Sequence, residues 1–99
     1  MERGGYIYIM SNKTRTTLYI GVTSSLYWRA LEHKNGDGSI FTSRYKCYDL
    51  IYFESFTSIE EAINREKTLK NWKREWKLNL IKKINPKMLD LTEDVKEYI

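Results

Sequence analysis

The chain has 99 residues, enough for one domain with a single modest core. Hydrophobic residues make up 41% and charged residues 30%, which is typical of a soluble globular protein. No apolar run approaches the roughly 20 residues of a transmembrane helix, and the N-terminus does not resemble a signal peptide. Cys47 is the single cysteine, which excludes an intrachain disulfide and favours a cytoplasmic protein without membrane contact.

The formal net charge of +4 is unevenly distributed along the chain. Residues 1–86 contain 15 Lys and Arg against 9 Asp and Glu, whereas residues 87–99 contain 2 against 4. We therefore predict a basic domain over 1–86, followed by an acidic C-terminal tail over 87–99. A basic domain suits an anionic partner such as nucleic acid, although basic proteins without such a partner are also common.

Two Tyr- and Ile-rich runs, residues 6–10 and 18–22, have the composition of β-strands. The segment between them is short and polar, which favours an antiparallel hairpin. Because side chains alternate along a strand, the first run has two distinct faces, one with Tyr6 and Tyr8 and the other with Ile7 and Ile9.

A helix is predicted over residues 25–34, with the hydroxyls of 23–25 available to cap its first turn. Arg29 and His33 lie four residues apart, just beyond the edge of its apolar side. The two could be unrelated surface neighbours or parts of one site. A polar loop is expected over 35–46, and a third strand over 49–54.

Two further helical stretches follow. Thr57 and Glu60 have the spacing of a capping box at the start of the first. The second spans about residues 73–84 and is stopped by Pro86, and the two stretches could be continuous.

Glu66 breaks the pattern of the first of these helices, because it points along the apolar direction. That direction is otherwise surrounded by Ile59, Ala62, Ile63, Leu69 and Lys70. A carboxylate there is costly unless a cation or hydrogen bonds compensate for it. Either a basic side chain supplies this compensation, or a divalent metal does. Mg²⁺ takes oxygen ligands and often uses only one or two carboxylates, so such an ion would be mostly water-coordinated.

The ordered set of Tyr8, Tyr19, Arg29, His33 and Glu66 resembles the GIY-YIG nuclease module. Tyr6-Ile7-Tyr8 and Tyr19-Ile20-Gly21 stand at its two tripeptides, and the similarity covers roughly residues 5–86. Glu61 to Glu66, followed by Leu69-Lys70, is typical of the small stand-alone members grouped with the YhbQ-type proteins. The resemblance implies an α+β fold, in which a three-stranded antiparallel sheet is flanked by helices.

The resemblance also implies an endonuclease that hydrolyses phosphodiester bonds with one Mg²⁺ or Mn²⁺ ion. Glu66 would bind the metal, and Arg29 would hold the scissile phosphate. Tyr19 would activate or position the attacking water, with Tyr8 as the alternative base, and His33 would lie near the nucleophile. An isolated tyrosine has a pKa of about 10, so nearby cations would be needed to favour its phenolate.

The partner is expected to be nucleic acid, with DNA favoured and branched, damaged or single-stranded forms all open. Further contacts are expected from the loop and later helices, at Arg44, Lys70, Asn79 and Asn85. The family carries a late Asn at the site, and spacing does not choose between the last two. Val22 stands where the incision subunit of bacterial excision repair has a lysine. A non-catalytic nucleic-acid-binding module is the alternative function, and the chain is expected to be a monomer or weak dimer.

Overall fold

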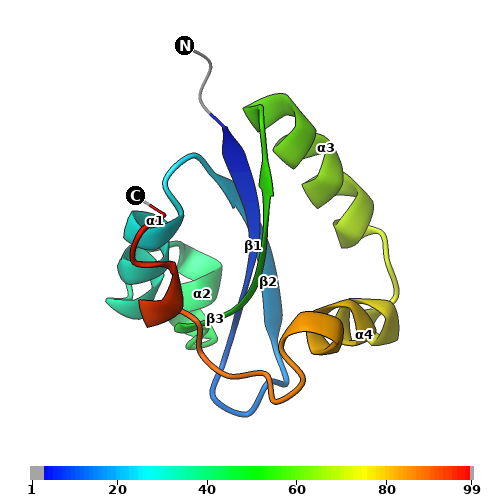
Figure 1. Cartoon of the computed structure of the whole chain (residues 1–99). Helices are drawn as coiled ribbons and strands as arrows, with labels where there is room; N and C mark the ends of the chain where they lie inside the picture. The colour runs from blue at the N-terminus through cyan, green and yellow to red at the C-terminus, as the bar shows by residue number, and fades with distance from the viewer. Residues whose placement is uncertain (1–3, 99) are drawn as a thin grey trace.

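The structure is a computed structural model that describes residues 4–98. Three antiparallel strands form one sheet in the order β2-β1-β3, and helices cover both of its faces (Figure 1). The strands are β1 (Gly5–Ser11), β2 (Leu18–Thr23) and β3 (Asp49–Phe56). The helices are α1 (Leu26–Lys34), α2 (Ile40–Arg44), α3 (Ile59–Lys70) and α4 (Arg74–Ile84), followed by the 3₁₀ helix η1 (Glu93–Val95). This arrangement confirms the predicted α+β class.

The alternation of β1 separates two apolar layers, as the sequence predicts. Tyr8 and Met10 face α1, where they pack with Leu26, Ala30, Leu50 and Val95. Ile7 and Ile9 face the opposite way and pack with Ile20, Ile51, Leu69 and Ile81 beneath α3 and α4. Within the hairpin, Tyr8 is paired with Gly21 on β2, and on the other side with Phe53 on β3. The register therefore places Tyr8 in the centre of the sheet.

Several helix boundaries differ from the prediction in detail. The hydroxyl that caps α3 belongs to Ser58, which accepts from the backbone N–H of Glu61, rather than to Thr57. The N-cap residue of α1 is Ser25, but no side-chain hydrogen bond caps that helix. α3 and α4 are separate helices, since α3 ends at its C-cap residue Asn71. The expected loop over 35–46 contains the short helix α2, whose N-cap Ser39 accepts from the N–H of Thr42.

The chain beyond Pro86 returns to the α1 side of the sheet (Figure 1). Val95 is fully buried there, and the N–H of Leu91 donates to the carbonyl of Leu50 at 2.6 Å. At the N-terminal end of α1, the backbone carbonyl of Tyr98 accepts from the N–H of Tyr27. At its C-terminal end, the carboxylate of Asp90 pairs with the ammonium of Lys34 at 2.7 Å. The acidic segment is thus packed on the domain, and the division of the chain at residue 86 stays a prediction.

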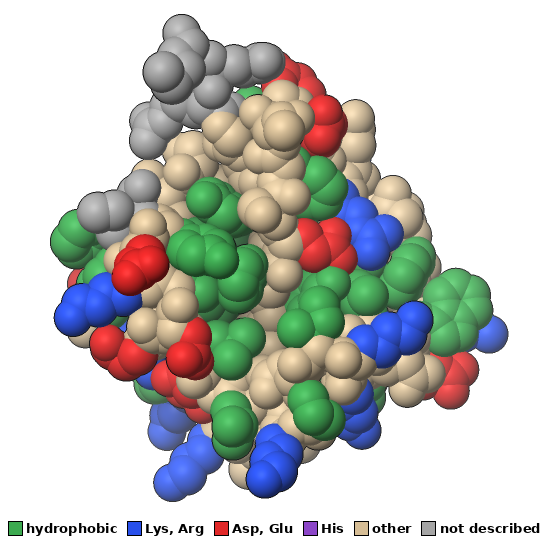
Figure 2. Space-filling model, in the orientation of Figure 1, with side chains coloured by type: hydrophobic (Ala, Val, Ile, Leu, Met, Phe, Trp, Pro, Cys, Tyr) green, Lys and Arg blue, Asp and Glu red, His purple; other side chains and the backbone are tan. Residues whose placement is uncertain are grey.

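Charged side chains of both signs lie on the face shown in Figure 2. Several Lys and Arg side chains follow its lower edge, near the β1–β2 turn, and acidic side chains lie over the C-terminal segment and also elsewhere on this face. Among the helices of residues 4–98, none combines the length and the apolar character that crossing a membrane requires.

Candidate active site

Three side chains predicted from the sequence meet at the centre of the α1-facing side of the sheet. The Tyr8 hydroxyl lies 2.9 Å from Nε2 of His33 and accepts from Nε of Arg29 at 3.2 Å. Tyr8 comes from β1, whereas the other two come from successive turns of α1. The four-residue spacing of Arg29 and His33 therefore allows both side chains to contact the Tyr8 hydroxyl, so the two are not unrelated surface neighbours.

His33 is fully buried, whereas the sequence predicts a position just beyond the edge of the apolar side of its helix. Its Nδ1 lies 2.9 Å from the hydroxyl of Thr42, which in turn lies 3.3 Å from the Ser39 carbonyl. When Thr42 donates to that carbonyl, it accepts from Nδ1–H of His33, and Nε2 is left to accept from the Tyr8 hydroxyl. This tautomer gives every member of the buried chain a partner, which is how a buried polar network is stabilised.

Two glycines allow these rings to pack so closely. A Cβ on Gly21 would overlap the phenol ring and hydroxyl of Tyr8, and one on Gly38 would overlap the imidazole of His33. The glycine of the second tripeptide is thus required by Tyr8, which is its partner across the hairpin. Gly38 and Thr42 were not predicted as site residues, although a Ser39 N-cap followed by Thr42 was a local signal of α2.

Burial sets the protonation of this cluster. It raises the pKa of Tyr8 to about 12, despite the opposing effect of the Arg29 cation. It also lowers the pKa of His33 to about 4, with the Arg29 charge acting in the same direction. At neutral pH the proton therefore stays on Tyr8 and the imidazole is neutral. Tyr8 is suited to donate or position a hydrogen bond, and it is poorly suited to act as a base.

Tyr19 differs from Tyr8 in being partly exposed and without a hydrogen bond from its hydroxyl to any residue of 4–98. Its ring lies beside the cluster, 6.4 Å from the Tyr8 ring and 5.5 Å from that of His33, measured between centroids. A free phenol at the exposed edge of a buried network is available to a water or a phosphate oxygen. Val22 does not join it, because Val22 packs in the layer beneath α3.

Glu66 lies on α3, on the other side of the sheet, and α3 packs against both β1 and β2. Its side chain is 20% exposed, and its carboxylate lies 3.5 Å from the ammonium of Lys70, which is itself 55% exposed. The apolar direction of this helix contains the buried Ala62 and Leu69, whereas Ile63 is 38% exposed. Within residues 4–98, no hydrogen bond or ion pair joins Glu66 to the cluster of Tyr8, Arg29 and His33.

The donors present fit a divalent ion held by one carboxylate. A single long contact to an exposed lysine leaves most of the lone pairs of Glu66 free, and hard cations such as Mg²⁺ prefer such oxygens. The described part of the chain contains no group of three or more His, Cys, Asp or Glu side chains arranged around an ion. Water and substrate oxygens would therefore complete the coordination shell.

The remaining predicted contact residues are not brought to the cluster. Asn85 is buried, and its amide nitrogen donates to the carbonyls of Ile51 and Leu89, both at 2.9 Å. Its amide group fixes the start of the C-terminal segment. Asn79 is exposed on α4, and Arg44 is exposed at the end of α2, 5.9 Å from the ring centroid of Tyr45.

The chain is similar to known proteins over most of its length. The model of the GIY-YIG catalytic domain matches residues 4–79. UPF0213 protein SSP2268 of Staphylococcus saprophyticus is 37% identical over 76 residues, which are 77% of this chain and 92% of that protein. UPF0213 protein CPE1444 of Clostridium perfringens is 40% identical over 76 residues, 77% of this chain and 81% of that protein. The solution structure of UPF0213 protein BH0048 from Bacillus halodurans superposes with a TM-score of 0.53 and 28% identity, covering 83% of this chain and 86% of that one.

Proposed function

Since the chain belongs to the GIY-YIG catalytic domain family, we propose that it is a metal-dependent endonuclease that hydrolyses phosphodiester bonds in DNA. The family is a nuclease family, and nucleic acid is its class of substrate. The observation that carries the proposal is the cluster of Tyr8, Arg29 and His33 beside the free hydroxyl of Tyr19. Arg29 and Tyr19 are both partly exposed, so a guanidinium and a free phenol are open to a substrate.

Arg29 binds the scissile phosphate in this proposal. Its Nε is held by the Tyr8 hydroxyl, and its Nη1 has only a weak ion pair with Glu32 at 3.5 Å. A phosphate can displace that exposed carboxylate and receive two parallel hydrogen bonds from the planar guanidinium. Because Tyr8, which is itself hydrogen-bonded to His33, holds Arg29 in position, the positive charge is already in place when negative charge develops on the phosphate.

Tyr19 is the residue that we assign to the attacking water. Tyr8 keeps its proton because burial raises its pKa to about 12, so it is the weaker candidate for a base. Tyr19 is partly exposed and its hydroxyl has no hydrogen-bond partner within residues 4–98, so its oxygen can orient the water. Only as the phenolate would Tyr19 also accept the proton of that water. A divalent ion at Glu66 would neutralise phosphate charge and lower the pKa of bound water.

The proposal is tested by incubating supercoiled plasmid with purified protein and Mg²⁺ or Mn²⁺, for the wild type and for Glu66→Ala. We expect Glu66→Ala to lower the nicking rate by about a hundredfold or more, as the loss of a charge-stabilising group does. Removing the partly buried carboxylate should leave the melting temperature unchanged or higher. EDTA should stop the wild type as well.

Glu60→Ala is the matched control, because Glu60 is an exposed carboxylate on the same helix. It should nick at the wild-type rate. Equal rates for wild type and Glu66→Ala would refute the assignment. A wild type that binds DNA in EDTA but cleaves with neither metal would identify the chain as a non-catalytic binding module.

A further inference from the structure

The outward side of α2 carries aromatic rings that the proposed chemistry does not use. Phe41 is 41% exposed and Tyr45 is 47% exposed. The Phe41 ring stacks on that of Tyr19, with 5.8 Å between centroids and 29° between planes. Tyr45 continues the arrangement, 4.7 Å from the Phe41 ring. Tyr19, Phe41 and Tyr45, which we call the ring series, thus lead from the candidate active site onto the open surface.

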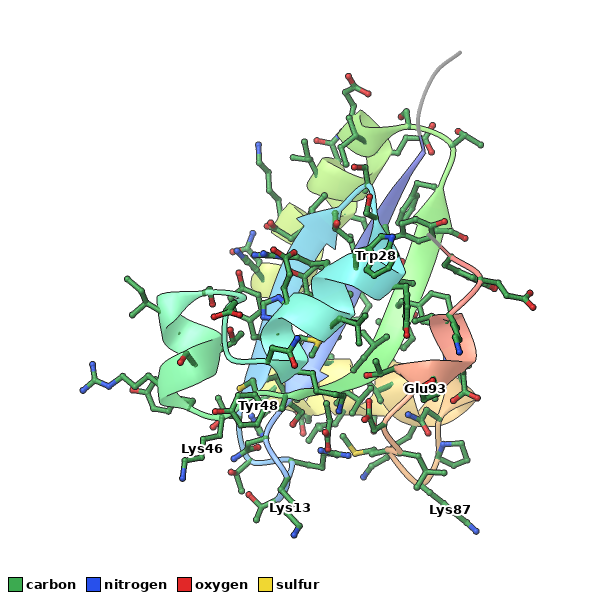
Figure 3. All side chains as sticks on the ribbon, turned by 90° about the vertical axis from the view of Figure 1, so that its left-hand side faces the viewer. Lys13, Trp28, Lys46, Tyr48, Lys87 and Glu93 are labelled. Carbon is green, nitrogen blue, oxygen red and sulfur yellow. The ribbon has the colours of Figure 1, made fainter. Side chains whose placement is uncertain are left out.

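The ring series ends at a cavity of about 600 Å³ between the β1–β2 turn and the segment that joins α2 to β3. The aromatic part of its lining is Tyr45 and Tyr48, and its charged residues are Lys13, Lys46 and Asp49. Figure 3 shows Lys13, Lys46 and Tyr48 at the same end of the molecule, with both lysine side chains extending outward. We call this feature the Lys13–Lys46 cavity.

The Lys13–Lys46 cavity has a net positive charge. Its single carboxylate, Asp49, is already paired with Arg15 at 2.8 Å and with Lys34 at 3.4 Å. Lys13 and Lys46 are both exposed, and neither forms an ion pair with another residue of 4–98. A cavity with aromatic walls and two uncompensated ammonium groups is complementary to the bases and phosphates of a nucleic acid strand.

The backbone at Lys46 provides a second observation. Lys46 has a φ of 57° directly after α2, in the left-handed region where glycine is the usual residue. A lysine there retains backbone strain that a glycine would relieve. This residue also lines the cavity, and its side chain extends outward from the molecule (Figure 3).

We propose that the ring series and the Lys13–Lys46 cavity bind an unpaired DNA strand that continues from the cleaved phosphodiester. Exposed bases would stack on Phe41 and Tyr45, and the phosphates would contact the two lysines. A base within a duplex is covered by its neighbours and offers no free face to a protein ring, so this surface selects single-stranded DNA or a single-stranded arm. The inference rests on the proposed function, because it defines the substrate of the same site.

Binding in EDTA tests the inference separately from cleavage. Fluorescence anisotropy is measured with a labelled single-stranded 20-mer, a blunt duplex of the same sequence, and that duplex carrying a single-stranded arm. We expect the two DNAs with unpaired bases to bind at least tenfold more tightly than the blunt duplex. Phe41→Ala with Tyr45→Ala should weaken their binding by about tenfold or more, and should leave the weak duplex binding almost unchanged.

Ile40→Ala is the control for the rings, because Ile40 is an 89% exposed apolar residue of the same helix. It should bind as the wild type does. Lys46→Gly separates binding from folding, because it should keep or raise the melting temperature while it weakens single-strand binding. The slope of the logarithm of the binding constant against the logarithm of the salt concentration should become shallower by about 0.7, as expected for the loss of one phosphate contact. Lys87→Ala, which removes an exposed lysine outside the cavity, should change neither.

Equal affinity for single-stranded and blunt DNA would overturn the inference, and so would wild-type binding by the Phe41 and Tyr45 double variant. Tighter binding of an RNA 20-mer of the same sequence would overturn the assignment to DNA. A protein that binds single strands through these rings but never cleaves would contradict the proposed function alone. A protein that cleaves blunt duplex with no effect of the ring substitutions would contradict this inference alone.

Discussion

Acidification should destabilise this protein through one buried imidazole. His33 has no exposed surface, and burial together with the Arg29 charge lowers its pKa from 6.5 to about 4. Between these two pH values the unfolded chain binds a proton that the folded chain excludes, so the free energy of unfolding falls as pH falls. The contribution of His33 is fully present above about pH 6.5 and is lost by about pH 4.

The magnitude follows from the shift. At about 1.36 kcal/mol per pKa unit, a change from 6.5 to about 4 amounts to about 3 kcal/mol. This is a large share of the roughly 5–15 kcal/mol that stabilises a typical domain. Asp90 acts in a separate window. Burial alone would raise the pKa of Asp90, but hydrogen bonds from Lys34 and Thr92 outweigh burial and lower it. The stability that Asp90 contributes is therefore lost only below the pH range in which His33 becomes protonated.

Urea unfolding at intervals from pH 7 to pH 4 measures the effect, with His33→Gln as the comparison. The variant lacks the titrating ring, so its free energy of unfolding should change much less across this window, whatever its stability at pH 7. Because the chain has a single histidine, the imidazole proton resonances can be assigned to His33 without ambiguity. An imidazole that titrates near 6.5 in the folded protein, or equal slopes for the two proteins, would refute the reasoning.

Two further substitutions probe the cluster. Tyr19→Phe removes one hydroxyl from the exposed edge, and we expect it to lower the single-turnover cleavage rate by about 10²-fold or more while DNA affinity changes less than threefold. An unchanged rate would transfer the role of base to Tyr8 or His33. Gly21→Ala places a methyl group against the buried ring of Tyr8, so chemical denaturation should show a loss of about 1–3 kcal/mol. Wild-type stability of this variant would show that the ring can move.

The strands and their two faces could be predicted from sequence because they depend on local alternation. Tyr8 and Ile7 are neighbours in the chain and lie in different layers of the structure, as a period of two requires. The first helix was also predictable, since its apolar positions repeat at helical spacing. The pattern of apolar residues did not predict α2, because a five-residue helix is too short to show such a repeat, and Ser39 as an N-cap residue was its one local signal.

The burial of His33 could not be predicted from the helix itself. On a helical wheel it lies at the edge of the apolar side, and its partners Tyr8 and Thr42 come from segments 25 residues before it and 9 residues after it. Asn85 was similarly ambiguous, because its partner Ile51 lies 34 residues away. The sequence predicted Tyr8, Tyr19, Arg29 and His33 as candidates, whereas the hydrogen bonds of Tyr8 with Arg29 and His33 depend on tertiary packing.

The two contacts that the C-terminal segment makes with α1 have a consequence for the design of shortened or tagged proteins. Tyr98 is bonded to the first turn of α1 and Asp90 to its last residue, so this segment braces the helix that carries Arg29 and His33. Both braces lie beyond residues 4–79, the part that the family model matches. A protein trimmed to the matched residues would keep every candidate catalytic side chain and lose the support that fixes two of them. The last residues of the chain therefore belong with the site when its boundaries are chosen.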